Sequence, residues 1–224
     1  MIEIKGLVCG YGEKLVLENL NGNFESGQIH GVLGKNGAGK TTLFNTLFGF
    51  HKPKQGHISW MDQSIQKTQI SFLETNGFFY PMMTGMEYLR IIQDHEIEIH
   101  RWNKLFELPL DEYAENYSTG MKKKLSFLGV LIQNRPIWIL DEPFNGVDIE
   151  SNEKLMQIIQ RTKSENRVIF ISSHIMSMLT RVCDRIHVLD EGHFIQTYNK
   201  GHFDQLEKEF QQSIEDELDG LLSL

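Results

Sequence analysis

The feature that most constrains this chain is a glycine-rich stretch with the pattern G-x-x-x-x-G-K-T at 34–41. The apolar run Ile29–Leu33 before it predicts a strand, and residues 42–48 after it predict a buried helix. In that setting glycines let successive backbone N–H groups point at one anion, and the helix N-terminus adds partial positive charge. A glycine-rich turn that only caps a helix would explain the glycines but not the pair Lys40-Thr41. The sequence therefore predicts a phosphate-binding loop.

Each position of this loop has an expected task. Lys40 is expected to reach the β- and γ-phosphates of a nucleotide, and the Thr41 hydroxyl is expected to ligate Mg²⁺. The residues predicted to hold the phosphates are Gly34, Lys35, Asn36, Gly37, Ala38, Gly39, Lys40, Thr41 and Thr42.

Length and charge narrow the class of protein. A chain of 224 residues is long enough for one domain with an inserted subdomain. The formal net charge of -8 argues against a nucleic-acid partner, and the three lysines at 122–124 do not make a basic stripe. Two cysteines without metal-ligand spacing, no apolar run of membrane-spanning length and no signal peptide predict a reduced, cytoplasmic setting.

The hydrophobic pattern predicts an α/β protein. The first thirty residues alternate and turn, which predicts an antiparallel β-meander. Apolar strands at 137–140, 168–171 and 186–189 alternate with helices at about 150–163 and 176–183, which predicts a parallel sheet. A helical pattern interrupts this order and predicts an α-helical subdomain inserted at about 75–131. Residues 201–224 predict an amphipathic helix with an acidic face, for which docking on the protein's own core is the preferred interpretation.

Two adjacent carboxylates, Asp141 and Glu142, follow the buried strand 137–140. Ligands of open α/β sheets bind at the carboxyl ends of the strands, so Asp141 is expected to hold Mg²⁺ through water. Glu142 is placed to act as general base on the attacking water. The alternative is a helix N-cap pair before Pro143. His174 ends the next strand, where it is either an ordinary hydrogen-bonded histidine or a contact to the γ-phosphate.

In chain order these features resemble the ATP-binding cassette (ABC) ATPase domain, over roughly residues 1–200. The resemblance implies a P-loop NTPase fold with an N-terminal antiparallel β subdomain, an inserted helical subdomain, and ATP and Mg²⁺ as cofactors. The matching features are Tyr11 as the aromatic that stacks on adenine, the Walker A loop at 34–42, a signature at 117–121, the Walker B strand at 137–142, a D-loop at 144–148 and His174 as the switch histidine.

The signature departs from the usual LSGGQ form. It reads Y-S-T-G-M, so it keeps Ser118 and Gly120 but has Thr119 and Met121 in place of glycine and glutamine. This form is similar to that of exporter-type ABC ATPases. The resemblance implies that Ser118 and Gly120 contact the γ-phosphate bound by a second, head-to-tail copy of the chain. From the residues alone, Ser118 also fits a cap for a helix over 121–131.

The Q-loop departs further from the family pattern. Alignment puts Thr75 at the position of the family's glutamine, with Glu74 next to it. Threonine is too short to span to a metal as glutamine would. Three alternatives remain open: Glu74 substitutes as a metal ligand, a water fills in, or metal sensing is weaker.

The resemblance implies an ATP-hydrolysing subunit of a transporter, of exporter type, which drives a separate polytopic membrane subunit through ATP-dependent dimerisation. It would then sit on the cytoplasmic face of the membrane through that partner. An apolar patch at 78–83 is the candidate contact, with Met82 and Met83 expected to be exposed and at least half of the patch packed within the subdomain. The alternatives are a non-transport ABC ATPase and a hydrolysis-deficient regulatory cassette.

Overall fold

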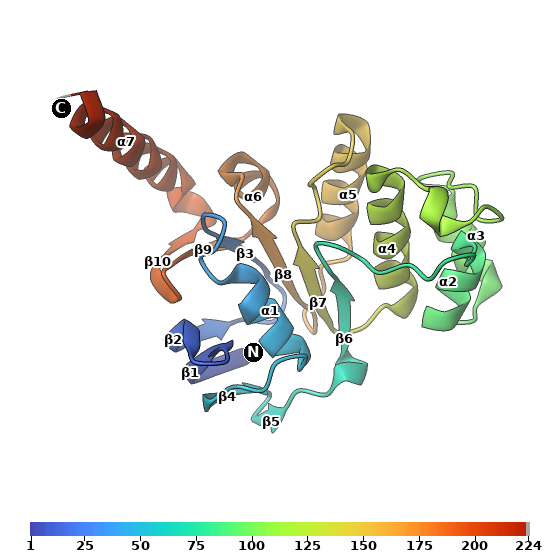
Figure 1. The fold of residues 1–224 in the computed structure, drawn as a ribbon, viewed down its shortest axis with the longest axis horizontal. Coiled ribbons are helices and arrows are strands. Elements are labelled where there is room, and N and C mark those ends of the chain that lie inside the picture. The colour runs from blue at the N-terminus through green and yellow to red at the C-terminus, as the bar shows by residue number, and fades with distance from the viewer. Residues whose placement is uncertain (223–224) are drawn as a thin grey trace.

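The computed structural model describes residues 1–222, apart from the side chains of 213, 214, 217 and 219–222. Two sheets lie on either side of helix α1 (Lys40–Phe48) (Figure 1). The smaller sheet has the order β2-β1-β4-β5 and consists of β1 (Ile2–Tyr11), β2 (Lys14–Phe24), β4 (Gln55–Trp60) and β5 (Gln63–Ser64). The larger has the order β10-β9-β3-β8-β7-β6 and consists of β3 (Ile29–Leu33), β6 (Ile70–Leu73), β7 (Ile137–Asp141), β8 (Val168–Ser173), β9 (Arg185–Asp190) and β10 (His193–Asn199).

The predicted parallel sheet is confirmed for five strands, β6 to β9 and β3. Every residue of β3, β7 and β8 is buried, as their unbroken apolar runs predicted. The sixth strand, β10, was not anticipated and pairs antiparallel with β9. Glu191 and Gly192 join the two strands, and both have positive φ, at 42° and 79°. Such a two-residue turn matches the twist of a hairpin, so this dipeptide was an available signal.

The predicted antiparallel structure near the N-terminus is confirmed, but it is a single hairpin and not a meander. β1 and β2 form one antiparallel hairpin, but β3 leaves for the larger sheet. The third strand of the smaller sheet is β4, which comes after α1 and pairs with β1. Local alternation predicts a strand but not its partner, because pairing depends on which faces must be buried together.

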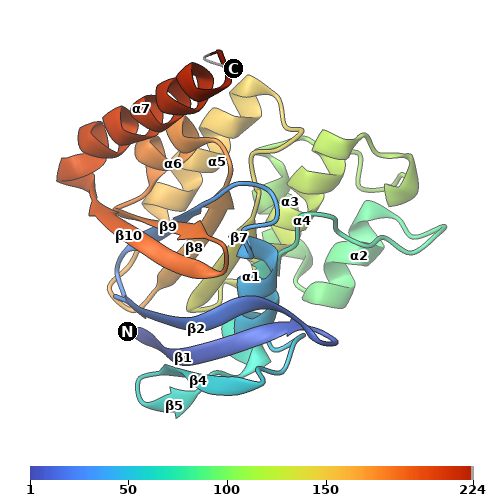
Figure 2. The same ribbon diagram turned by 60° about the vertical axis from the view of Figure 1, so that its left-hand side comes forward.

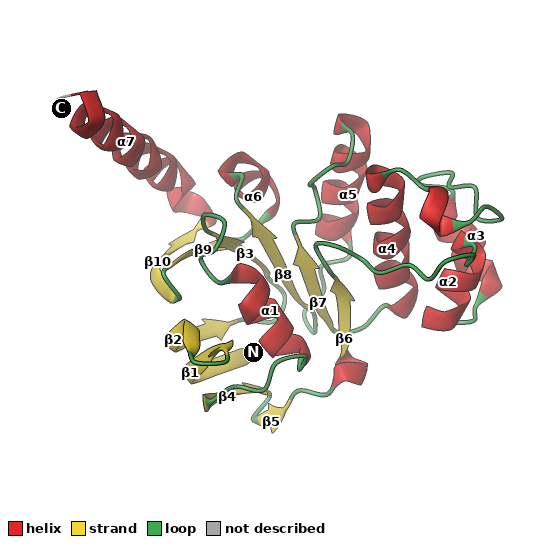
Figure 3. Cartoon of the chain, viewed as in Figure 1, coloured by secondary structure: helices red, strands yellow, loops and turns green. Residues whose placement is uncertain are grey.

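Helices cover both faces of the larger sheet (Figure 3). On one face Leu43, Phe44 and Leu47 of α1 pack in a core that β1 and β2 also line. On the other face lie α4 (Thr119–Gln133), α5 (Ile149–Arg161) and α6 (Met176–Val182), which share the larger core cluster. This sandwich holds the carboxyl ends of the parallel strands beside the start of α1.

The helical subdomain lies between β6 and β7 in the chain and consists of α2 (Gly85–Ile92), α3 (Glu96–Asn103) and α4 (Figure 2). Thr84 and Glu87 form a capping box that starts α2. Of the patch at 78–83, only Phe79 and Met83 are partly buried, and Phe79 packs on Tyr88. The expectation that at least half of the patch packs inside is therefore wrong, whereas Met82 is exposed as expected and Met83 is partly exposed.

Helix α7 (Phe203–Leu222) ends the described chain and projects away from the body (Figure 1). Phe203 and Leu206 in its first turns are buried, and the Tyr198 hydroxyl of β10 donates a hydrogen bond to Glu209. Further along, Phe210 and Leu218 are exposed, while Ile214 and Leu221, which belong to the same predicted stripe, lie outside the described side chains. Among the described side chains of α7, the docking on the protein's own core is therefore seen at the start of the helix. Among the described residues, no helix has both the length and the apolar character needed to cross a membrane.

A pair of buried histidines lies in the larger sheet, His30 on β3 and His187 on β9. His30 Nε2 lies 2.9 Å from the carbonyl oxygen of Glu25, which can only accept, so this nitrogen carries the proton. His30 Nδ1 then accepts from His187 Nε2 at 3.2 Å, and His187 Nδ1 accepts from the Thr197 hydroxyl at 3.0 Å. All four ring nitrogens are satisfied with both rings neutral.

This pair predicts a loss of stability in mild acid. Burial lowers the pKa of His30 from 6.5 to about 4 and that of His187 from 6.5 to about 3. Below about pH 6.5 the unfolded chain takes up protons that the folded chain refuses, so the free energy of unfolding falls as the pH falls. The slope is about 1.4 kcal/mol per pH unit for each histidine. Urea unfolding at about pH 7 and at about pH 5 measures this difference.

The matched variants are His30→Leu/His187→Leu, which removes the pair, and His57→Gln, which removes an exposed histidine of β4. In the double variant the free energy of unfolding should depend less steeply on pH. In His57→Gln its dependence on pH should be the same as in the wild type. An equally steep dependence in the double variant would reject the assignment to this pair.

Candidate active site

The predicted phosphate loop lies between β3 and α1, where the sequence placed it. Gly39 caps α1 with φ at 110°, and a Cβ there would lie 2.8 Å from a methyl carbon of Leu17. At Gly34 a Cβ would lie 2.5 Å from the carbonyl oxygen of Leu189. Both positions therefore require glycine, one for its backbone conformation and one for a close approach of two chain segments.

A cavity of about 380 Å³ opens beside this loop. Tyr11, at the end of β1, lines its rim with 51 % of its surface exposed and packs edge-on against His51. An exposed aromatic ring beside a phosphate loop is suited to stack on a base. The other lining residues are Lys14, Val16, Asn36, Gly37, Gly39, Lys40, Thr41, Thr42, Thr75 and Glu142.

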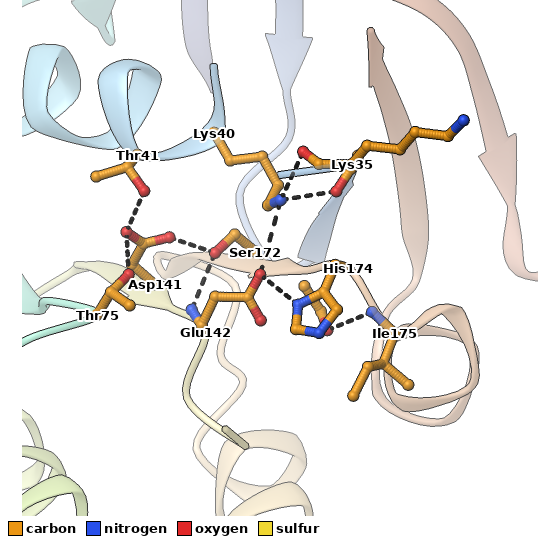
Figure 4. A network of polar contacts seen from close by, with 11 residues as sticks. Lys35, Lys40, Thr41, Thr75, Asp141, Glu142, Ser172, His174 and Ile175 are labelled. Atoms are coloured by element: carbon orange, nitrogen blue, oxygen red, sulfur yellow. Dashed lines mark hydrogen bonds and ion pairs between the residues drawn. The ribbon is translucent and has the colours of Figure 1, made fainter. Parts of the chain in front are cut away.

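The Lys40 side chain is buried at the edge of this cavity (Figure 4). Its ammonium donates to the carbonyl oxygens of Gly34 at 2.7 Å and Lys35 at 3.2 Å. It also lies 3.7 Å from Oε1 of Glu142. A buried cation is thereby held where α1 begins, and its positive charge adds to that of the helix N-terminus.

Asp141 ends β7 and is 1 % exposed. Three hydroxyl groups donate to its carboxylate: Thr41 to Oδ2 at 2.8 Å, Thr75 to the same oxygen at 2.6 Å, and Ser172 to Oδ1 (Figure 4). Three donors fix the orientation of the carboxylate. Thr41 and Asp141 therefore offer adjacent hard oxygen ligands, the kind that Mg²⁺ prefers.

Glu142 follows in a strained conformation, with φ at 48°. Its backbone N–H donates to the Ser172 hydroxyl at 2.9 Å, so the same serine holds both carboxylate residues. Its Oε1 lies 3.1 Å from Nδ1 of His174, at the end of the neighbouring strand β8 (Figure 4). The carboxylate is thus held between Lys40 and His174 at the wall of the cavity. The helix N-cap alternative does not hold, because Asp148 is the residue that caps α5.

The structure separates the two Q-loop candidates. Thr75, which is too short to span to a metal as glutamine would, reaches Asp141 directly through its hydroxyl. Glu74 is exposed and lines a different cavity of about 210 Å³ with Lys123 and Ser126. Partial burial and the charge of Asp141 raise the pKa of Glu74. The structure therefore brings Thr75, and not Glu74, to the oxygens of the candidate metal site.

The signature lies at the start of α4, away from the P-loop of the same chain. The Ser118 hydroxyl accepts from the backbone N–H of Met121 at 3.2 Å, which confirms the predicted cap. A Cβ on Gly120 would lie 2.9 Å from the carbonyl oxygen of Gly146, so this turn packs closely against the D-loop. Neither Ser118 nor Gly120 lines the cavity beside the P-loop.

Sequence reasoning missed two lysines that join α4 to these loops. Lys123 donates to the carbonyl oxygens of Glu74 at 3.3 Å and Thr75 at 2.8 Å. Lys124 pairs with Asp148 at 2.8 Å. Both belong to the local basic run at 122–124, to which the sequence assigned no contact. Their helical spacing from the buried positions Leu125 and 127–128 was the signal that one of them would turn inward.

Comparisons with known proteins agree with this geometry. A family model described as ABC transporter matches residues 17–145. The chain is 31% identical to the bacitracin transport ATP-binding protein BcrA of Bacillus licheniformis, over 97% of this chain and 75% of that protein.

Two solved structures share the fold. One, the ATP binding subunit of an ABC transporter, has a TM-score of 0.83 and 26% identity and covers 94% of this chain and 93% of that chain. The other is a dimeric ATP-binding cassette in a post-hydrolysis state bound to ADP and Pi. It has a TM-score of 0.80 and 20% identity, and it covers 89% of this chain and 99% of that chain.

Proposed function

Since this chain belongs to the ABC transporter family of ATP-binding proteins, we propose that two copies of it close head to tail on ATP and thereby drive a separate membrane subunit. The chain is the ATPase subunit of a transporter. The observation that carries the proposal is the arrangement at the 380 Å³ cavity, which the P-loop and Glu142 line and Ser118 does not. Asp141 is bonded to Thr41 of this lining, and His174 to Glu142.

ATP is proposed to lie with its base on Tyr11 and its phosphates along 34–42. Lys40 would move from the P-loop carbonyls onto the β- and γ-phosphates. Thr41 and Asp141 would hold Mg²⁺, which neutralises phosphate charge when it is bound. Glu142 would accept the proton of the attacking water, and His174 would fix the orientation of that carboxylate.

The head-to-tail pair is supported by the position of the signature. Ser118 and Gly120 present the N-terminus of α4 to solvent at some remove from their own P-loop cavity. A helix N-terminus attracts phosphate, so a second copy would supply the nucleotide that these residues contact. Loss of the γ-phosphate would then remove the contact and open the pair.

A mixing experiment tests this pairing. Lys40→Ala subunits lack the P-loop charge, and Ser118→Arg subunits block the signature, so each variant alone should turn over little ATP. In a mixed pair, one composite site has both parts intact. With random pairing about half of the pairs are mixed, and each mixed pair has one intact site out of two. Turnover should therefore recover to about a quarter of the wild-type rate. A mixture that is no more active than its components, with pairs confirmed by light scattering in ATP, would reject the arrangement.

The membrane subunit is proposed to contact the helical subdomain. Support comes from Phe78, Tyr80 and Met82, which are 70 %, 59 % and 70 % exposed. They adjoin a hollow of about 550 Å³ lined by Pro81, Met82, Met83, Glu87, Arg90, Ile91 and Asp94. Exposed aromatic and methionine side chains of this kind mark binding surfaces. We propose export as the direction, from the signature form Y-S-T-G-M, and a position on the cytoplasmic face of the membrane through that partner.

A further inference from the structure

Lys123 is a buried cation on α4, five residues after the signature serine, and it is 7 % exposed. Its ammonium lies against the loop after β6 and donates to the backbone carbonyls of Thr75 at 2.8 Å and Glu74 at 3.3 Å. Burial lowers the pKa of Lys123, while the charges of Asp141 and Glu142 act in the opposite direction. A buried charge is tolerated where it is hydrogen-bonded, and the two carbonyl oxygens meet that need for Lys123.

The loop that Lys123 holds is the one that contacts the candidate metal site. The Thr75 carbonyl accepts from Lys123, and the Thr75 hydroxyl donates to Oδ2 of Asp141 at 2.6 Å. That same oxygen accepts from Thr41 at 2.8 Å. A continuous chain of hydrogen bonds therefore leads from α4, through Thr75, to the carboxylate beside the P-loop.

We propose that Lys123 is a positioning residue for ATP hydrolysis: its ammonium fixes the backbone at Glu74 and Thr75, so that the Thr75 hydroxyl holds the Asp141 carboxylate in place. The same contact joins the helix that carries Ser118 to the metal-binding carboxylate of its own subunit. This inference rests on the proposed function of the site. It assigns the place of the family's Q-loop glutamine to two residues, Thr75 for the contact to Asp141 and Lys123 for its placement.

The chain offers a matched control in the neighbouring residue. Lys122 also lies on α4 and also donates to a backbone carbonyl, but its acceptor is Glu115 at 2.9 Å and not a carbonyl of the Thr75 loop. Lys123→Met and Lys122→Met thus remove the same charge and the same kind of hydrogen bond from one helix. Thr75→Val removes the hydroxyl group that Lys123 is proposed to position and keeps the shape of the side chain.

The experiment compares wild type, the three single variants and Lys123→Met/Thr75→Val. For each, the ATP dissociation constant in EDTA and the Mg²⁺ concentration for half-maximal turnover are measured. We expect Lys123→Met and Thr75→Val each to raise the Mg²⁺ requirement about tenfold, the usual size for a residue that orients a metal ligand. The double variant should be no worse than Thr75→Val alone, because both act through one hydroxyl. The Mg²⁺ requirement of Lys122→Met should stay within about twofold of that of the wild type. The ATP dissociation constant in EDTA should also stay within about twofold of the wild-type value in every variant.

Three results would overturn the inference: an unchanged Mg²⁺ requirement in Lys123→Met, additive effects in the double variant, or ATP binding in EDTA lost together with turnover. The last would mean that Lys123 only maintains the fold. Wild-type protein that binds no ATP in EDTA or in Mg²⁺ would instead refute the proposed function, so the two failures are distinguishable.

Discussion

Glu142→Gln is expected to lower ATP turnover by about a hundredfold to ten-thousandfold, the range that a positioned general base contributes. Glutamine keeps the size and hydrogen-bonding shape of the side chain but cannot accept the proton of the attacking water. Glu142 is 9 % exposed, and its Oε1 lies 3.1 Å from His174 and 3.7 Å from Lys40, so its position is set from two sides. The strained φ of 48° shows that the surrounding structure enforces that position.

The same substitution should leave ATP binding intact and should trap the closed pair. It removes a negative charge next to the site where the γ-phosphate is proposed to lie. Turnover in Mg-ATP, together with light scattering in ATP, measures both effects. Glu150→Gln is the control, since Glu150 is an exposed carboxylate of α5 that pairs with Lys154. Full-rate turnover in Glu142→Gln would reject the assignment of the base.

Lys40→Ala is expected to weaken ATP binding by about tenfold to a hundredfold, because a charge-assisted contact to phosphate is lost. Lys40 is the buried cation at the start of α1, and two P-loop carbonyls aim its ammonium along the loop. Alanine leaves the backbone N–H groups of the loop in place, so some phosphate binding should remain. Equilibrium titration with ATP measures the dissociation constant directly.

Lys163→Ala serves as the control for that experiment. Lys163 pairs with Asp184 at 2.9 Å and does not line the cavity beside the P-loop. The control should bind ATP as the wild type does. A dissociation constant that is the same in Lys40→Ala and wild type would mean that the phosphates lie elsewhere, and the assignment of the P-loop would fail with it.

Local features of the sequence were enough to predict the P-loop, the buried strands and the two carboxylates at the carboxyl end of β7. Gly34 and Gly39 lie at positions where the backbone allows no other residue. The unbroken apolar runs at 137–140 and 168–171 indicate strands that are buried on both faces, as β7 and β8 are. Because parallel strands end at one edge of a sheet, placing Asp141 at the end of β7 and His174 directly after β8 also placed them at the same edge.

The partners of each strand and the direction of each polar side chain were decided by tertiary structure. β1 pairs with β4 across the whole P-loop unit, and no local pattern specifies that choice. Thr75 and Glu74 are neighbours in the chain, yet only the register of β6 beside β7 turns the threonine towards Asp141. Lys123 differs from Lys122 by one position on a helix, a rotation that carries one ammonium into the interior.

The sequence by itself thus determined the class of fold and the chemistry of the phosphate site, because these depend on backbone conformation and on residues within one strand–loop–helix unit. The tertiary structure decided which hydroxyl groups hold Asp141, that Ser118 lies away from its own P-loop, and that Phe203, Leu206 and the Tyr198–Glu209 hydrogen bond hold the first turns of α7 against the body. Contacts between distant segments depend on the packing of the whole core, to which every element contributes a part.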